Sequence, residues 1–261
     1  MSLQPELKAL IFDVDGTIAE TERDGHRIAF NRTFEEAELP WSWTVELYGQ
    51  LLDIAGGKER IRHYMEHFQP DFAPPEDVDA YITQLHALKT KHYRSLLKTG
   101  GIPPRPGVQR LIDEARSAGL RLAIATTSAL PNAMAVLEQA LSPNSFDWFE
   151  VIAAGDIVPE KKPSPAIYRY VLEAMQLDAN ECLAIEDSPQ GLQAARAAGI
   201  TTIVTVNDYT RDRDFRRAAL TLDHLGEPDC PCNVIAGELD ACLLHLDIAS
   251  LRWLHQRTAS E

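Results

Sequence analysis

The stretch that decides the fold is Lys8-Ala9-Leu10-Ile11-Phe12-Asp13-Val14-Asp15-Gly16-Thr17, an apolar run that stops at two aspartates. A short apolar run bounded by glycine is typical of a buried strand, so we predict a strand over residues 8–12. Asp13 then lies at the carboxyl end of that strand and Asp15 on the turn, where open α/β sheets bind ligands. Because two buried carboxylates are costly unless a cation joins them, the stretch indicates a cation-binding site.

Three later segments also place reactive side chains where an apolar run stops. One run ends at Thr126 and another at Glu186 and Asp187. Lys162 precedes two prolines that fix the start of a helical pattern. A hydroxyl, a lysine and two more carboxylates therefore come to strand ends like the first.

From residue 107 onward, helical and strand-like patterns alternate along the chain. They predict strands over 120–126, 149–153, 182–186 and 200–205, together with helices over 107–118, 131–140, 164–175 and 189–198. This alternation is typical of a doubly wound α/β sheet, to which the strand at 8–12 also belongs.

The segment between the first strand and the rest of the sheet has only helical patterns. We therefore predict two domains: a sheet-forming core of residues 1–20 and 101–261, and a helical cap of residues 21–100 inserted after the turn that carries Asp13 and Asp15. The linkers near 18–22 and at Gly100-Gly101 are expected to act as hinges, so that the cap serves as a lid. The alternative is a helical subdomain packed rigidly on the sheet.

Composition excludes some classes of function. The chain has 261 residues, 45% of them hydrophobic, and a net charge of -14, which argues against a nucleic-acid partner. No run approaches the ~18 consecutive apolar residues of a membrane span, and the N-terminus lacks a basic region followed by an apolar one. We expect a cytoplasmic monomer with no membrane partner.

The chain has four cysteines, Cys182, Cys230, Cys232 and Cys242. Without a secretory signal they are expected to be reduced thiols. The last three could form a zinc site with His245, although their spacing supports such a site only weakly. The alternative is a surface loop followed by an amphipathic helix over about 236–257, used for core packing or, less readily, for a dimer contact.

In this order, the four motifs resemble those of the haloacid dehalogenase superfamily, in the branch of metal-dependent phosphatases and phosphomutases. Further segments are similar to the CbbY group of that superfamily, namely Glu20-Thr21-Glu22, Gly25-His26-Arg27, Phe30-Asn31, Gly56-Gly57-Lys58-Glu59-Arg60-Ile61, Ala153-Ala154-Gly155-Asp156, Lys161-Lys162-Pro163-Ser164-Pro165 and Tyr209-Thr210-Arg211. The resemblance implies a Rossmann-like core with an inserted α-helical cap. It also implies a Rubisco-associated, Mg²⁺-dependent phosphatase that hydrolyses a sugar phosphate, xylulose-1,5-bisphosphate, through an aspartyl-phosphate.

Elementary electrostatics also indicates that a phosphatase site of this kind needs positive charge. A carboxylate that approaches a phosphate dianion to about 4 Å is repelled by roughly 8 kcal/mol at an effective dielectric of about 20. That repulsion corresponds to about six powers of ten in rate. The site therefore needs a divalent cation and a fixed positive side chain, and Asp13, Asp187 and Lys162 match this requirement. Oxygen ligands suit Mg²⁺ better than zinc.

By resemblance, Asp13 is the nucleophile and Asp15 is the general acid and base. The catalytic residues implied are Asp13, Asp15, Thr126 and Lys162, and the Mg²⁺ ligands implied are Asp13, Asp15 through its main-chain carbonyl, Glu186 and Asp187. Residues at i and i+2 can share one face of a strand, so this division of roles is physically sensible. Asp187 and Ser188 could also cap the following helix, and both roles can hold together.

The resemblance also implies a set of residues that bind substrate: Gly16, Glu20, His26, Lys58, Arg60, Thr127, Ser128 and Asn132. A bisphosphate has a second dianion that the core motifs cannot reach, and Lys58 and Arg60 are the candidates to neutralise it, with Ser128 and Asn132. Glu20 would hold sugar hydroxyls. His26 is either a substrate contact or an ordinary residue of a polar helix face.

Three rivals to this interpretation exist. A β-phosphoglucomutase-like enzyme would share the core residues and transfer the phosphoryl group between sugar hydroxyls instead of to water. A binding protein without turnover is disfavoured because no core motif position is missing. A true 2-haloacid dehalogenase is disfavoured because that chemistry uses no metal and lacks an acid at the position of Asp15.

Overall fold

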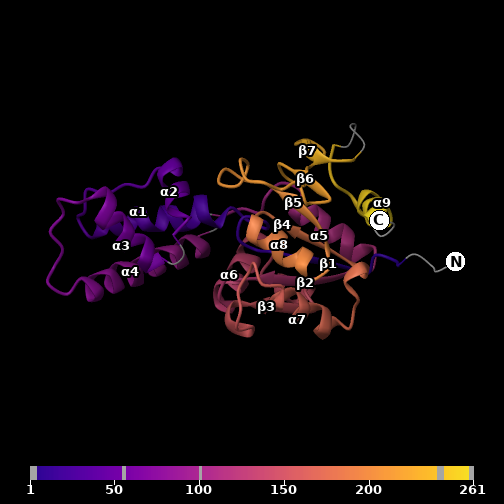
Figure 1. Cartoon of the computed structure of the whole chain (residues 1–261), viewed down its shortest axis with the longest axis horizontal. Coiled ribbons are helices and arrows are strands. Elements are labelled where there is room, and N and C mark those ends of the chain that lie inside the picture. The colour runs from indigo at the N-terminus through magenta and orange to yellow at the C-terminus, as the bar shows by residue number, and fades with distance from the viewer. Residues whose placement is uncertain (1–4, 55–56, 100–101, 240–243, 259–261) are drawn as a thin grey trace. The chain divides into compact units, whose positions relative to one another are not determined.

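The computed structural model describes residues 5–54, 57–99, 102–239 and 244–258. The chain divides into two compact units, one formed by Met1–Glu20 with Pro103–Glu261 and the other by Thr21–Ile102 (Figure 1). Within the described part of the chain, no helix combines the length and the apolar character that a membrane span requires.

The first unit is built on a seven-stranded sheet with the strand order β3-β2-β1-β4-β5-β6-β7. Its strands are β1 (Ala9–Phe12), β2 (Arg121–Thr126), β3 (Val151–Ala154), β4 (Cys182–Glu186), β5 (Thr201–Thr205), β6 (Leu220–Leu222) and β7 (Val234–Gly237). All neighbouring pairs are parallel except β6 and β7, which are antiparallel. The sheet confirms the predicted doubly wound α/β class, and β1, which leads into the turn with Asp13 and Asp15, lies inside it.

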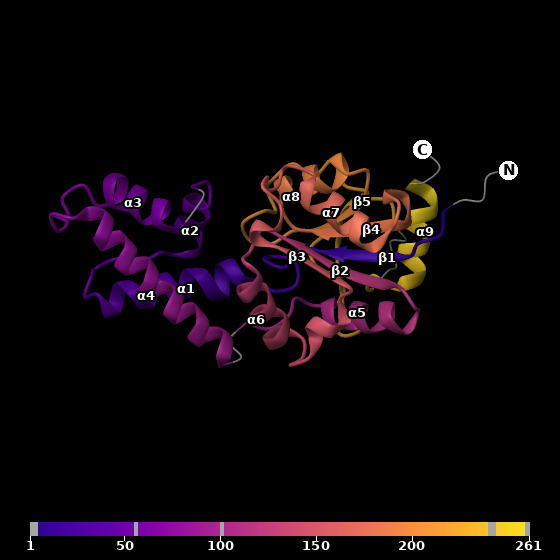
Figure 2. The same ribbon diagram turned by 90° about the horizontal axis from the view of Figure 1, so that it is seen from below.

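Helices cover both faces of this sheet. They are α5 (Val108–Ser117), α6 (Leu130–Ala140), α7 (Ala166–Met175), α8 (Pro189–Ala197) and α9 (Ile248–Thr258), with short 3-10 turns at Ser145–Trp148, Gly155–Ile157 and Ala179–Glu181. Figure 2 shows α7 and α8 on one face and α5 and α6 on the other. Parallel sheets are buried on both faces, and β1, β2 and β4 have the near-continuous apolar sequences that this arrangement requires.

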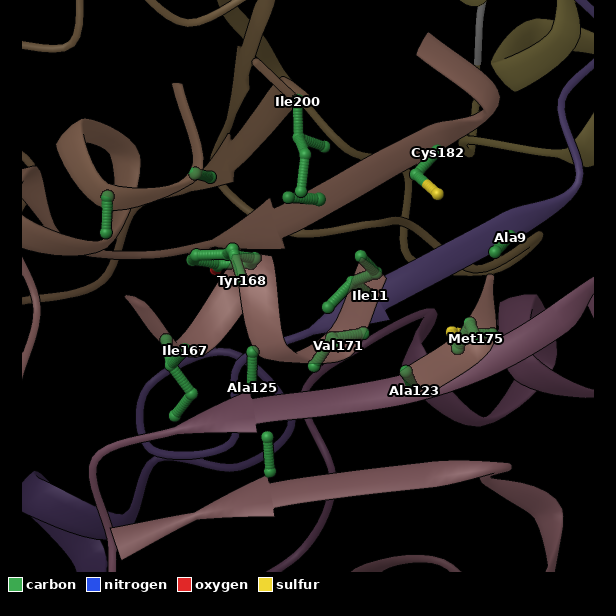
Figure 3. Close-up of a cluster of buried hydrophobic side chains, with 14 of the residues drawn as sticks. Ala9, Ile11, Ala123, Ala125, Ile167, Tyr168, Val171, Met175, Cys182 and Ile200 are labelled. Carbon is green, nitrogen blue, oxygen red and sulfur yellow. The ribbon is translucent and has the colours of Figure 1, made fainter. Parts of the chain in front are cut away.

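The core under α7 and α8 shows how sequence and packing agree (Figure 3). Ala9, Ile11 and Ala123 of the strands meet Val171 and Met175 of α7, and all five side chains are buried. Full burial of an aliphatic side chain of the size of Ile, Val or Met contributes about 1.5–3 kcal/mol. The small alanines on the strands let α7 lie close to the sheet.

The second unit contains only helices within its described residues. A π-helical turn, Thr21–His26, leads into α1 (Arg27–Glu36), followed by α2 (Val45–Leu51), α3 (Gly57–Phe68) and α4 (Val78–Lys98). Aromatic rings form its core: Trp43 lies 4.5 Å from Phe30 and 4.9 Å from Phe34 between ring centroids. The proposed role of this unit as a lid stays a prediction.

The two segments that link the units are paired with each other on the side of the sheet domain. Ala19 forms an antiparallel bridge with Pro104, and the Arg105 amide donates to the Ile18 carbonyl at 2.8 Å. The predicted hinge at Gly100-Gly101 lies outside the described residues.

The prediction of a helix over about 236–257 is wrong in its first part. Val234–Gly237 forms β7, which pairs with β6, and α9 begins only at Ile248. The backbone of β7 pairs with β6, which would otherwise be a sheet edge with unpaired backbone groups. The strand β6 has only three residues, too few to give a recognisable alternation.

Candidate active site

The turn after β1 is shaped by a glycine. Gly16 has φ +83°, a left-handed conformation that residues with a Cβ rarely adopt. A Cβ at Gly16 would also lie 2.1 Å from Asp187 Oδ2. The glycine therefore serves both the backbone conformation and the close approach of the Asp187 carboxylate to the turn.

Three buried carboxylates meet beside this turn. Phe12 pairs with Ile185 in the parallel register of β1 and β4, so the residues that follow, Asp13 and Glu186, come side by side. Carboxylate oxygens of Asp13, Glu186 and Asp187 lie within 4.8 Å of one another. Among the described residues, this is the one cluster of His, Cys, Asp and Glu that could hold a metal ion.

Lys162 joins two of these carboxylates to the next strand. Its Nζ donates to Asp13 Oδ1 at 2.8 Å, to Glu186 Oε1 at 2.5 Å and to the Ala125 carbonyl at 2.8 Å. Tyr168 of α7 donates its hydroxyl to the same Glu186 oxygen. The ammonium group is therefore fixed in place by three acceptors.

The charges in the cluster do not balance. Burial, together with the negative charges of Glu186 and Asp15, raises the pKa of Asp13 to about 7 against the opposing effect of Lys162. Burial and the neighbouring carboxylates also raise the pKa of Asp187 well above its ordinary value. Burial alone would lower the pKa of Lys162, but the charges of Asp13 and Glu186 outweigh it and the pKa is raised.

The acidic cluster fits a hard divalent cation. Glu186 Oε2 is buried and has no hydrogen-bond partner among the described residues. Three carboxylates face one ammonium group, and each carboxylate is an oxygen ligand of the kind that Mg²⁺ prefers. A bound divalent cation would balance this buried negative charge and give the unsatisfied oxygen a partner.

The end of β2 supplies hydroxyl groups. The Ser128 hydroxyl donates to Asp15 Oδ2, and the Ser128 amide donates to Thr126 Oγ1 at 3.2 Å. Thr126 is buried, Thr127 is exposed, and Asn132 lies half-buried in the first turn of α6. The structure thus brings Ser128 to Asp15 and Thr126 to Ser128. Among the described residues, no hydrogen bond joins Thr127 or Asn132 to the acidic cluster.

Glu20 lies at the end of the sheet domain's outgoing linker. It forms an ion pair with Arg105, with 2.8 Å between Glu20 Oε1 and Arg105 Nε. Glu20 is half-buried. The ion pair with Arg105 therefore fixes the orientation of the Glu20 carboxylate.

The predicted substrate residues of the helical unit have differing surroundings. Lys58 is exposed in the first turn of α3. Arg60 is buried and donates to Tyr48 Oη at 2.9 Å, to the Leu51 carbonyl at 3.0 Å and to the Ile54 carbonyl at 3.3 Å. Arg60 therefore contributes to the packing of its own unit, and Lys58 remains available to solvent. Gly56, which precedes them in the motif, lies outside the described residues.

His26 ends the π-helical turn and has a defined tautomer. Lys89 Nζ lies 2.9 Å from His26 Nδ1, and because an ammonium group can only donate, Nδ1 accepts and Nε2 bears the proton. The imidazole also packs on Tyr93, with 4.0 Å between ring centroids. π-Helical turns inside helical segments are frequent at functional sites, which keeps His26 a candidate.

Three residues around the cluster were not predicted: Tyr168, Arg105 and Asn207. Asn207 Nδ2 donates to Asp187 Oδ2 at 2.7 Å. Asn207 follows β5 closely, so the rule that found the other strand-end residues could have found it too. In the sequence, Tyr168 falls among the apolar residues of α7, so the pattern does not predict that its hydroxyl contacts the acidic cluster.

The zinc hypothesis gains no support among the described residues. Cys182 is buried in β4, where burial raises its pKa to about 12. Cys230 Sγ lies 3.8 Å from His224 Nε2, and Cys232 is buried, but no cluster of metal ligands forms there within the described ranges. Cys242 lies outside those ranges.

Comparison with known proteins agrees with this geometry. Residues 7–199 match the family described as haloacid dehalogenase-like hydrolase. The chain is also 45% identical over 256 residues to the plasmid-encoded protein CbbY of Cupriavidus necator, covering 98% of this chain and 99% of that protein. The chain belongs to the CbbY family of haloacid dehalogenase-like hydrolases. It is an enzyme of the phosphatase class in that superfamily, as its motifs suggested.

Two solved structures are also similar to this CbbY family member. A mutant CbbY from Rhodobacter sphaeroides in complex with xylulose-1,5-bisphosphate is 43% identical, with a TM-score of 0.71, covering 84% of this chain and 94% of that one. A putative β-phosphoglucomutase from Thermotoga maritima is 26% identical, with a TM-score of 0.63, covering 77% and 86%. The first of these structures holds a sugar bisphosphate, and the second is described as a putative sugar-phosphate mutase.

Proposed function

We propose that this enzyme is a Mg²⁺-dependent phosphatase that hydrolyses xylulose-1,5-bisphosphate through an aspartyl-phosphate on Asp13. The observation that carries the proposal is the strand-end cluster, in which Asp13 is buried and held by Lys162 beside Glu186 and Asp187. The substrate assignment is supported by the identity to CbbY proteins and by the ligand of the Rhodobacter sphaeroides structure.

In this proposal the Mg²⁺ ligands are carboxylates of Asp13, Glu186 and Asp187 with the main-chain carbonyl of Asp15. When bound, the ion would neutralise charge on the phosphoryl group and on the cluster itself. Asn207 orients Asp187 by its 2.7 Å hydrogen bond, so the ligand set has a supporting side chain on β5's carboxyl end.

The protein's own residues would divide the phosphoryl transfer between them. Asp13 attacks phosphorus, and Lys162 with Thr126 stabilises the negative charge on the transferring oxygens. Asp15 protonates the leaving oxygen and then accepts a proton from the hydrolytic water, with its carboxyl oriented by the Ser128 hydroxyl. Gly16 contributes a backbone that can approach the phosphate closely because it has no side chain.

Recognition of the second phosphate is proposed for the helical unit. Lys58 is the stronger candidate because it is exposed, whereas the three contacts of Arg60 within its own unit compete with a substrate role. Glu20, oriented by Arg105, is proposed to accept hydrogen bonds from sugar hydroxyls.

A panel of phosphorylated metabolites, including xylulose- and ribulose-1,5-bisphosphate, tests the proposal. With Mg²⁺ present, we expect the highest kcat/KM for release of inorganic phosphate from xylulose-1,5-bisphosphate. Isomerisation of a hexose phosphate without phosphate release would instead support the mutase alternative. Size-exclusion chromatography and cell fractionation would test the expected monomer and its cytoplasmic location.

A further inference from the structure

Arg105 lies at the point where the chain returns to the sheet domain. It is buried, and it sits between Pro104, which pairs with Ala19, and Gly107, at the start of α5. Its own amide donates to the Ile18 carbonyl. A buried arginine at a linker has a desolvated charge, so its partners decide its role.

The guanidinium group of Arg105 uses all three of its nitrogens. Nε pairs with the Glu20 carboxylate at 2.8 Å. The two terminal nitrogens donate to main-chain carbonyls of Gly16 at 2.5 Å, Thr205 at 3.0 Å, Val206 at 2.5 Å and Asp223 at 2.7 Å, and to the Thr205 hydroxyl at 3.0 Å. One side chain therefore joins the catalytic turn, the ends of β5 and β6, and the outgoing linker.

Two of these contacts border the acidic cluster directly. Gly16 is the residue against which Asp187 packs, and Val206 precedes Asn207, which donates to the same carboxylate. A shift of the Gly16 carbonyl would move the turn that carries Asp15, and a shift at Val206 would move the amide of Asn207. The rigid planar fork of arginine fixes both at once, which the single ammonium group of lysine cannot do.

We propose that Arg105 is a positioning residue for the phosphoryl-transfer site and for substrate recognition. It holds the catalytic turn at Gly16 in the geometry needed for attack, and it orients the carboxylate of Glu20. The second half rests on the proposed function, because it assumes that Glu20 binds sugar hydroxyls. The first half needs only the phosphatase chemistry.

The chain offers a matched control in Arg110. Its side chain is also largely buried and donates to the main-chain carbonyls of Leu225, Gly226 and Leu246, with Glu114 as ion-pair partner. None of these contacts involves the turn or the acidic cluster. Arg110→Lys should therefore report what the loss of a carbonyl-binding guanidinium does to stability alone.

The test compares Arg105→Lys and Arg110→Lys for Tm, kcat and KM, with Mg²⁺, on a small aryl phosphate and on xylulose-1,5-bisphosphate. Misplacement of reacting groups by about 1 Å can cost about 10²-fold, so Arg105→Lys should lower kcat about 10- to 100-fold on both substrates. Arg110→Lys should lower Tm about as much as Arg105→Lys does, but it should change kcat less than about twofold. Equal kcat values for Arg105→Lys and wild type, or equal losses in both variants, would overturn the proposal.

A second variant covers the case in which Arg105→Lys does not fold. Thr205→Val keeps the shape of the side chain and removes only one acceptor of the guanidinium group, so kcat on the aryl phosphate should fall more than about twofold. An unchanged kcat with a lowered Tm would show that the contact serves stability alone. Wild-type enzyme that cleaves the aryl phosphate but not xylulose-1,5-bisphosphate would contradict the proposed substrate and leave the kcat test of Arg105 valid.

Discussion

The sheet domain and the helical unit hold their polar residues in different ways. At the strand ends, the buried carboxylates of Asp13 and Glu186 come side by side through the parallel register of β1 and β4. Lys162, from the loop before α7, donates a hydrogen bond to each of them. In the helical unit, Lys58 is exposed on a helix and Arg60 is bound to its own neighbours. Backbone hydrogen bonding thus positions the acidic cluster, whereas the substrate contacts proposed for the helical unit depend on side chains of packed helices.

Asp13→Asn should produce the largest effect, because it tests the region where geometry is most constrained. The amide is nearly isosteric but cannot form an acyl-phosphate, so kcat should fall by at least about 10³-fold. Circular dichroism should show an unchanged fold. Residual activity above about a tenth of wild type would contradict the role of Asp13 as nucleophile.

Asp15→Asn should have the second-largest effect on kcat. It removes general acid and base catalysis, which typically contributes 10²–10⁴-fold to kcat. Substrates with good leaving groups need less protonation, so the loss should be smaller on an aryl phosphate than on a sugar phosphate. Steady-state kinetics on both substrates measures the difference, and equal losses would show that Asp15 acts in some other way.

Lys58→Ala tests whether an exposed lysine of the helical unit contributes to substrate recognition. Loss of a charge-assisted contact costs about 1.5–3 kcal/mol, so Lys58→Ala should lower kcat/KM for the bisphosphate about 10- to 150-fold. On a small aryl phosphate the loss should be much smaller. Lys91→Ala, another exposed lysine of this unit, is the control and should have little effect on either substrate.

Arg60→Ala should behave differently, because its guanidinium group holds carbonyl groups of its own unit. We expect a Tm lowered by several degrees, since unsatisfied buried acceptors are costly. Similar kinetic losses on both substrates would place Arg60 in the packing of the unit. A loss confined to the bisphosphate with unchanged Tm would restore it as a recognition residue.

Mg²⁺ should stabilise the protein, and the stabilisation should grow with pH. The pKa of Asp13 is raised by burial to about 7, so in metal-free protein its contribution to stability is present below the unfolded pKa and is lost as pH rises through about 7. Mg²⁺ binds the ionised carboxylates, so its effect on Tm should be larger at about pH 8 than at about pH 5. Differential scanning calorimetry with Mg²⁺ or EDTA measures this, and Asp187→Asn should reduce the shift. A Tm indifferent to Mg²⁺ at both pH values would contradict the metal assignment.

The sequence predicted the positions of candidate site residues correctly where those residues lie at the end of a strand. Short apolar runs followed by polar residues located Asp13, Thr126 and Glu186 correctly at the ends of β1, β2 and β4. Arg105 could not be found this way, because its acceptors are main-chain carbonyls that carry no sequence signal and lie as far along the chain as Asp223. The strand β7 was missed for a related reason: its pairing with β6 is a tertiary contact that overrides a helical pattern.

Paired residues on antiparallel segments lie about 5 Å apart, so Ala19 and Pro104 bring together the points where the chain leaves and re-enters the sheet domain. A helical insert of another length or sequence can join the same two points without displacing a strand. Evolution, or an engineer, can therefore exchange the whole insert as a cassette. The carboxylates would keep their register while the range of accepted substrates changes.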